Sequence, residues 1–278
     1  MKKYIVVFAL GALAVLTTGC DKLKSRDHMN KGVQAYRNAR WPEAVEHFKA
    51  AVQLDPQNVN GKLYLATAYM TQYVPGVDDP RNQQFAQAAR EEFNAVLKEN
   101  PSDKTALASL ASLCYQEAQG IPKFEDKVKK LDESKEWNLK LIQTDPQAKE
   151  AYYTLAVIDW LKWYPNYMSA RAEMGMKPED PGPLKDKKVK EQLKEKYGAM
   201  LQDGIDNLKK ALAIDKNYDD AMSYMNLLIR QRADLLDTKE EYNQQVEEAN
   251  NWVQKSLDTK KAKAAKQPAT GGITQESK

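Results

Sequence analysis

The feature that most restricts the fold of this chain is a helix ending that recurs at a fixed interval. Proline follows an amphipathic segment at Pro56 in AVQLDPQN, Pro101 in VLKENPSD and Pro146 in LIQTDPQA, so successive prolines are 45 residues apart. Proline cannot continue an α-helix, because it lacks the amide donor and its ring clashes with the preceding turn. A fixed period of roughly 20–50 residues is typical of proteins built from stacked repeats.

Five segments share the phase of these endings. They begin at Ala44, Ala89, Ser134, Gly204 and Ala249, with spacings of 45, 45, 70 and 45 residues. In each, a small residue is followed by apolar residues at helical spacing, which predicts one buried stripe on a helix. A second helical pattern follows the first four segments, and DHMNKGVQAYRNARW takes its place in the first unit. The sequence therefore predicts an all-α protein of paired helices.

The pattern resembles the tetratricopeptide repeat (TPR). The match is closest in the first unit, where Gly32 takes the small position of the first helix, Ala44, Phe48 and Ala51 take those of the second, and Pro56 ends the unit. The resemblance implies a right-handed helical-hairpin solenoid of about five elongated repeats over residues 27–257. The chain departs from the family pattern at His28, Asn138, Lys216 and Lys261.

The repeat is longer than the roughly 34 residues of the family, by 45 − 34 = 11. Eleven residues make three helical turns, so a helix extended by that length keeps its buried face in register. We therefore expect taller hairpins rather than longer connections. Asp79 before Pro80 predicts a helix start, and Asp237 with Glu240 has the spacing of a capping box.

Two regions interrupt or end the repeats. The wider spacing of 70 residues indicates a long insertion in the fourth unit, at 168–200, where Pro178, Pro181 and Pro183 forbid a regular helix and a long second helix follows. This insertion either caps the stack or shapes a binding mouth. Residues 258–278 are rich in lysine, alanine and glycine, and past the first few residues they are predicted to form a disordered basic tail.

The N-terminus resembles a bacterial lipoprotein signal peptide. Residues 1–19 combine a basic start with a short apolar stretch, and TTGC places small residues before Cys20. The resemblance implies lipidation of Cys20, a tether at 20–26, and a cell-envelope protein that faces the periplasm or the exterior. Asp21 resembles an inner-membrane retention signal of some bacteria, which leaves the choice of membrane open. Cys114, on an apolar helical pattern, is interpreted as a core residue.

The sequence offers no evident site for catalysis, a cofactor or a metal. The chain has only His28 and His47, with no cysteine near either in sequence, which is too few ligands for a zinc site. A net charge of +3 gives no indication of nucleic-acid binding. A glycan-active enzyme on a helical solenoid is an alternative, for which Asp159 and Glu150 are the only carboxylates to consider.

The resemblance also implies a binding groove lined by the first helices of the units. The positions it implies are neutral and rich in Met, Tyr and Trp, which suits an extended or helical segment of another protein. They lack the lysine, arginine and asparagine density of family members that capture acidic peptide ends. The stretch WLKWYPNY, 160–167, either extends this surface or packs beneath the insertion. The groove residues are Met29, Val33, Tyr36, Leu63, Met70, Tyr115, Tyr153, Val157, Trp160 and Arg230.

The leading hypothesis is a non-catalytic, lipid-anchored envelope scaffold or assembly factor that binds a protein through this groove. The alternatives are the glycan-active enzyme and a structural spacer with no specific partner.

Overall fold

The computed structural model describes the backbone of residues 2–266 and the side chains of residues 20–266. Over this range the chain forms ten α-helices and no strand. The helices belong to two compact units, Met1–Thr144 and Asp145–Lys278.

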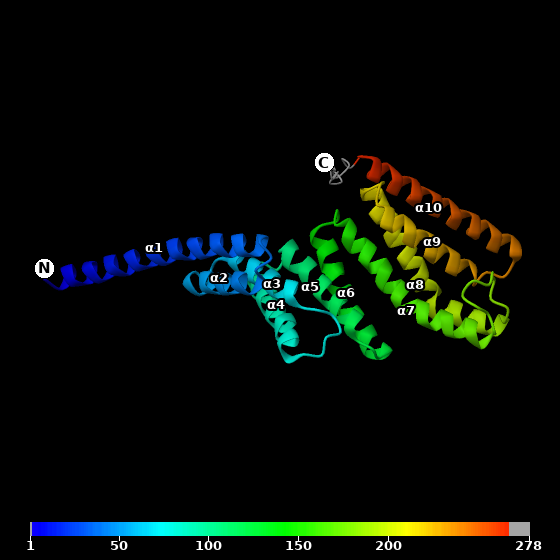
Figure 1. Cartoon of the computed structure of the whole chain (residues 1–278), viewed down its shortest axis with the longest axis horizontal. Coiled ribbons are helices and arrows are strands. Elements are labelled where there is room, and N and C mark those ends of the chain that lie inside the picture. The colour runs from blue at the N-terminus through cyan, green and yellow to red at the C-terminus, as the bar shows by residue number, and fades with distance from the viewer. Residues whose placement is uncertain (1, 267–278) are drawn as a thin grey trace, which may run out of the picture. The chain divides into compact units, whose positions relative to one another are not determined.

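The first unit consists of three helical hairpins (Figure 1). Each helix packs against its neighbours in the chain, and α3 also contacts α5, so that the first helices of adjacent hairpins lie together. The helices are α1 Lys2–Arg37, α2 Trp41–Leu54, α3 Val59–Gln72, α4 Pro80–Glu99, α5 Lys104–Gly120 and α6 Phe124–Thr144.

The second unit repeats this arrangement in two hairpins, made by α7 Lys149–Glu173, α8 Lys187–Ile214, α9 Asp219–Ala233 and α10 Lys239–Lys266 (Figure 1). Here α7 contacts α9 in the way that α3 contacts α5. Trp163, Leu201, Leu208 and Met225 lie at the centre of its apolar core. The all-α solenoid architecture predicted from the repeat is confirmed.

The phase of the repeats is set by the predicted small residues, all of which are buried. Ala44, Ala89, Ser134, Gly204 and Ala249 occupy this position in the five second helices. In the first hairpin a second small residue, Gly32 on α1, lies directly against the ring of Phe48. Absence of side-chain bulk at these positions lets neighbouring helices approach closely enough to bury both apolar stripes.

The third hairpin shows how the chain tolerates a polar residue where the family has an aromatic one. Asn138 is buried, and its Nδ2 donates a hydrogen bond to the carbonyl oxygen of Ser134 at 2.9 Å. Ser134 Oγ in turn donates to the carbonyl oxygen of Ala111 on α5 at 2.8 Å. Because both buried polar side chains are hydrogen-bonded, the substitution costs far less than an unpaired amide would.

The additional residues of each repeat lie mainly in the second helices. The second helices α4 and α6 have 20 and 21 residues, against 14 in α2, whereas α3 keeps 14 residues. The expectation of lengthened helices alone is wrong for the second hairpin, where the connection 73–79 takes up part of the excess. Asn82 closes this connection by bonding the amide and the carbonyl of Val74, each at 2.8 Å.

One predicted helix start is confirmed and one is displaced. Asp79 caps α4 by accepting hydrogen bonds from the amides of Arg81 and Asn82, at 2.8 and 3.1 Å. The capping box of α10 is formed one residue later than expected, by Thr238 and Glu241. Thr238 starts the helix because its hydroxyl accepts the Glu241 amide at 3.2 Å.

The helical region extends further at both ends than the predicted range 27–257. Residues 20–26 are helical rather than a tether, because α1 continues through them and Ser25 is buried with its hydroxyl donating to the Ala51 carbonyl at 2.8 Å. Residues 258–266 continue α10, where Lys263 pairs with Asp219, so a disordered tail from 258 is wrong over this range. The rest of the predicted tail, 267–278, and the side chains of the predicted signal peptide, 1–19, lie outside the described residues.

Replacing Gly32 with alanine should destabilise the protein. A Cβ at this position would lie 2.5 Å from Cε1 of the buried Phe48 ring, and overpacking of this kind costs about 1–3 kcal/mol. Gly198→Ala in α8 is the control, since its Cβ would meet nothing closer than Lys194 Cγ at 3.8 Å and alanine favours a helix by up to about 1 kcal/mol. Urea unfolding followed by circular dichroism measures both variants, and equal effects would contradict the packing argument.

Candidate protein-binding surface

Five aromatic side chains form a continuous row in the second unit, which we call the aromatic row. Its members come from α7, from α9 and from the turn before α9, and all are half-buried. The three from α7 follow one another at seven and four residues, which places them on one stripe of that helix. The row consists of Tyr153, Trp160, Tyr164, Tyr218 and Tyr224.

The rings of the aromatic row support one another. Tyr224 presents its edge to both Tyr153 and Trp160, with centroids 5.4 and 5.8 Å apart and interplanar angles of 88° and 89°. Trp160 also stacks on Tyr164 at 4.7 Å, and Tyr153 lies 5.2 Å from Tyr218. Such pairs contribute about 0.5–1.5 kcal/mol each beyond their buried area. The row is therefore a preformed surface of large rings that still face solvent in part.

The Tyr218 phenol of the row is neutral at physiological pH. Burial, helped by nearby acidic residues, raises the pKa of Tyr218 to about 12, so its phenol keeps its proton. The indole Nε1 of Trp160 is buried, and no acceptor for it exists among the described residues. An unpaired buried donor costs about 1–3 kcal/mol.

The predicted groove residues of the second unit divide into three groups. Tyr153 and Trp160 belong to the aromatic row. Val157 is only 3% exposed, so its prediction as a binding residue is wrong: it lies on the core side of α7. Arg230 is half-buried on α9, and its guanidinium donates to Asn250 Oδ1 on α10 at 2.6 Å in an exposed hydrogen bond.

The predicted groove residues of the first unit are all half-buried. Met29, Val33 and Tyr36 lie on α1, and Tyr36 connects this helix to α3 through a 2.9 Å hydrogen bond between its hydroxyl and Thr71 Oγ1. Leu63 and Met70 on α3 pack against the core shared with α4 and α5, and burial raises the pKa of the Tyr115 phenol on α5. These residues form no row of touching rings like that of the second unit.

The stretch WLKWYPNY divides between two sides of α7. Trp160 and Tyr164 belong to the aromatic row, while Trp163 and Tyr167 are buried and stack on each other at 5.1 Å. Trp163 Nε1 donates to Gln231 Oε1 at 2.8 Å. The interpretation as intramolecular packing is confirmed for Trp163 and Tyr167, whereas Trp160 and Tyr164 stay half-buried.

A buried ion pair, not anticipated from the sequence, fastens the insertion beside these rings. Arg171 Nη1 lies 2.8 Å from Asp234 Oδ2, which also accepts the hydroxyl of Tyr167. Arg171 Nη2 donates to the carbonyl oxygens of Lys177 and Asp180 in the connection 174–186, at 2.7 and 2.6 Å. Burial raises the pKa of Asp234 above its usual range, although Tyr167 and Arg171 act in the opposite direction.

The insertion is therefore held by hydrogen bonds against one end of the second unit. The amide of Leu184 donates to the Asp234 carbonyl at 3.0 Å, and Lys190 Nζ donates to the Leu236 carbonyl at 2.8 Å. These contacts join the connection 174–186 and the start of α8 to the end of α9. The predicted long second helix is confirmed as α8.

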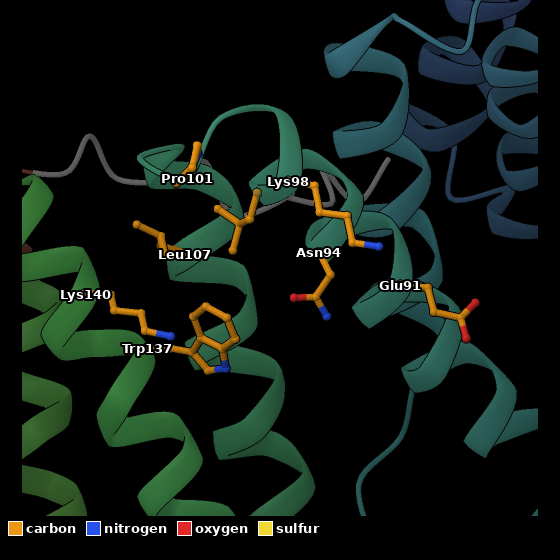
Figure 2. A pocket seen from close by; sticks show the side chains of 8 residues that line it. Glu91, Asn94, Lys98, Pro101, Leu107, Trp137 and Lys140 are labelled. Atoms are coloured by element: carbon orange, nitrogen blue, oxygen red, sulfur yellow. The ribbon is translucent and has the colours of Figure 1, made fainter.

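A separate hollow of about 690 Å³ lies on the second-helix side of the first unit. Figure 2 shows Asn94 and Lys98 of α4 on one side of this space and Trp137 and Lys140 of α6 on the other, while Glu91 extends away from it. Lys140 Nζ lies 4.1 Å from the centroid of the Trp137 ring. Sequence reasoning missed the hollow, because it considered binding only on the first helices. Its remaining lining residues are Leu97, Pro101 and Leu107.

The two carboxylates considered for a glycan-active site lie in different surroundings. Asp159 is fully buried and lies under Gly204, where a Cβ would be 3.7 Å from that of Asp159. Glu150 is exposed in the first turn of α7. Cys114 is buried as expected, and burial raises the pKa of its thiol. Over the described side chains, no group of three or more His, Cys, Asp or Glu residues is placed to hold a metal ion.

No family model and no curated protein matches the sequence. Among solved structures, MamA AMB-1 is 15% identical with a TM-score of 0.50, over 88% of this chain and 98% of that one. The MamA RS-1 ArsTM double mutant is 13% identical with a TM-score of 0.50, over 87% and 97%. TTC0263, a thermophilic TPR protein in Thermus thermophilus, is 15% identical with a TM-score of 0.45, over 87% and 99%. At these identities the likeness shows a fold and no more.

Breaking the buried ion pair should release the insertion. Asp234→Ala leaves the Arg171 charge buried without its carboxylate, and such changes cost about 3–5 kcal/mol. We expect a loss of that size in urea unfolding, together with faster hydrogen exchange over 174–186. The double variant Arg171→Met, Asp234→Leu removes both charges and should recover the part of the loss that comes from the unpaired charge, but not the hydrogen bonds to Tyr167, Lys177 and Asp180. A loss below about 1 kcal/mol for Asp234→Ala would contradict the assignment.

Proposed function

We propose that this protein is a lipid-anchored scaffold of the bacterial cell envelope, which binds a segment of another protein on the aromatic row. The observation that supports this function is the row itself: five half-buried rings in mutual contact on two rigid helices. Preformed aromatic rings supply most of the affinity in many protein interfaces, because they bury a large area while losing little side-chain entropy. The row is large enough for several side chains of a partner.

The character of the row favours a neutral, apolar partner segment. The phenol of Tyr218 is uncharged, and Arg230, the groove arginine nearest in sequence to the α9 ring of the row, donates a hydrogen bond to Asn250. An extended segment or an amphipathic helix that inserts apolar side chains between the rings fits the surface better.

The anchor in this proposal is Cys20. Its thiol is exposed on α1, directly after the apolar N-terminal stretch whose sequence resembles a lipoprotein signal. Stable attachment to a membrane requires more than one acyl chain, which a triacylated cysteine provides. Among the residues that the structure describes, no helix combines the length and apolarity needed to cross a bilayer.

Replacing Tyr153 and Trp160 together by alanine should abolish partner capture. The change removes two rings of the row and with them the central contacts of Tyr224, and hot-spot rings contribute about 2–4 kcal/mol each to binding. Capture is measured by crosslinking in intact cells from a photoreactive amino acid in place of Tyr164, followed by identification of the trapped protein.

Tyr152→Ala is the matched control for this experiment. Tyr152 is also half-buried on α7, but its ring lies 5.7 Å from Lys210 Nζ of α8, away from the row. Circular dichroism establishes that each variant stays helical. Capture that persists in the double variant, or that is lost equally in Tyr152→Ala, would count against the aromatic row as the binding surface.

Cys20→Ala should abolish acylation of the protein. The variant lacks the exposed thiol that would be acylated, so we expect incorporation of a palmitate analogue to vanish. Cys114→Ala is the control, because that thiol is buried and should not affect labelling. Labelling of Cys20→Ala equal to that of the parent protein would rule out the lipid anchor.

A further inference from the structure

The two histidines of the chain meet across the first hairpin. His28 lies on α1 and His47 on α2, and their Nδ1 atoms are 3.2 Å apart, with ring centroids at 5.4 Å and an interplanar angle of 49°. Both side chains are half-buried. They come from positions 19 residues apart, so only the pairing of α1 with α2 brings them together.

Tight contacts on both sides fix this arrangement. One turn before His28, Ser25 bonds the Ala51 carbonyl of α2, and one turn after it Gly32 lies against Phe48, the neighbour of His47. The two helices therefore have little freedom to separate at the histidines. A pair of imidazoles held in this way is a preorganised pair of nitrogen ligands.

The separation of the nitrogens matches two ligands of one transition-metal ion. With metal–nitrogen bonds of about 2.0–2.1 Å, a tetrahedral angle places the nitrogens about 3.3–3.4 Å apart and a right angle about 2.9 Å. The observed 3.2 Å lies between these values. A hydrogen bond between the rings at 3.2 Å would lie at the long end of the usual range of about 2.7–3.2 Å.

We propose that His28 and His47 bind one divalent transition-metal ion through their Nδ1 atoms. Neutral imidazole suits Zn²⁺, Ni²⁺, Cu²⁺ and Co²⁺, and it does not suit Mg²⁺ or Ca²⁺, which take oxygen ligands. Since these two residues provide only two ligands, water or a donor from a partner completes the coordination. The ion would connect α1 to α2 and stabilise the first hairpin, because the ligands are separated in the unfolded chain.

The test uses the whole untagged chain, stripped with a chelator, and Zn²⁺ as the probe. Because the chain has only two histidines, the imidazole proton resonances of His28 and His47 should shift together and saturate at one ion per chain. Calorimetric titration should give micromolar affinity, with a rise in the thermal midpoint that Mg²⁺ does not produce. Each of His28→Ala and His47→Ala should weaken binding by at least about tenfold.

Glu43→Gln is the control, since Glu43 is an exposed carboxylate on α2 that pairs with Arg40 at 2.9 Å. It should bind Zn²⁺ as the parent protein does. Three results would overturn the proposal: no shift of either histidine with millimolar Zn²⁺, a shift of only one, or unchanged affinity in both alanine variants. The resonances of the parent protein decide the question even where a variant fails to fold.

Discussion

The whole structure depends on the close approach of two helices within each hairpin. Ala44, Ala89 and Ala249 are fully buried at the same place of three second helices, and Ser134 and Gly204 take that place in the other two. At such a position a large side chain would hold the helices apart and uncover the apolar stripes. In the first hairpin the partner helix contributes Gly32, so the Phe48 ring fills the space between the helices. The repeat in sequence thus reflects the repeated contact between the two helices of each hairpin.

The sequence predicts correctly those features of the fold that depend on the residues of a single helix. Two local signals predict where the first helices of the later hairpins begin: the preceding helix ends one turn earlier, and an apolar stripe follows. These helices are α3, α5, α7 and α9. Boundaries that depend on another helix were missed. Residues 20–26 are polar and lack a period, yet they are helical because α2 offers the Ala51 carbonyl to Ser25. In the same way, Lys263 extends α10 by reaching Asp219 of α9.

The candidate site was predictable in part, for the same reason. Tyr153, Val157 and Trp160 lie within two turns of α7, and their angular positions differ by only a fraction of a turn. That small angular difference places Val157 in the core and leaves the two rings partly exposed. Which of these residues faces the core depends on where α8 and α9 lie. The His28–His47 pair and the Arg171–Asp234 pair were beyond sequence reasoning, since each joins residues from two helices with no motif to connect them.

Helix α7 presents two stacked aromatic pairs, and their different environments indicate which pair serves the fold. Trp163 and Tyr167 are buried, and their polar atoms bond Gln231 and Asp234. Trp160 and Tyr164 stack in the same way three residues earlier, but the indole N–H of Trp160 has no acceptor among the described residues. Both aromatic pairs bury apolar area. Only the Trp163–Tyr167 pair has acceptors for both its indole N–H and its phenol O–H. A pair retained for stability alone would gain from a phenylalanine at 160, which removes the unpaired donor and keeps a ring. In the function proposed above, the larger ring of the tryptophan serves the partner segment that binds the aromatic row.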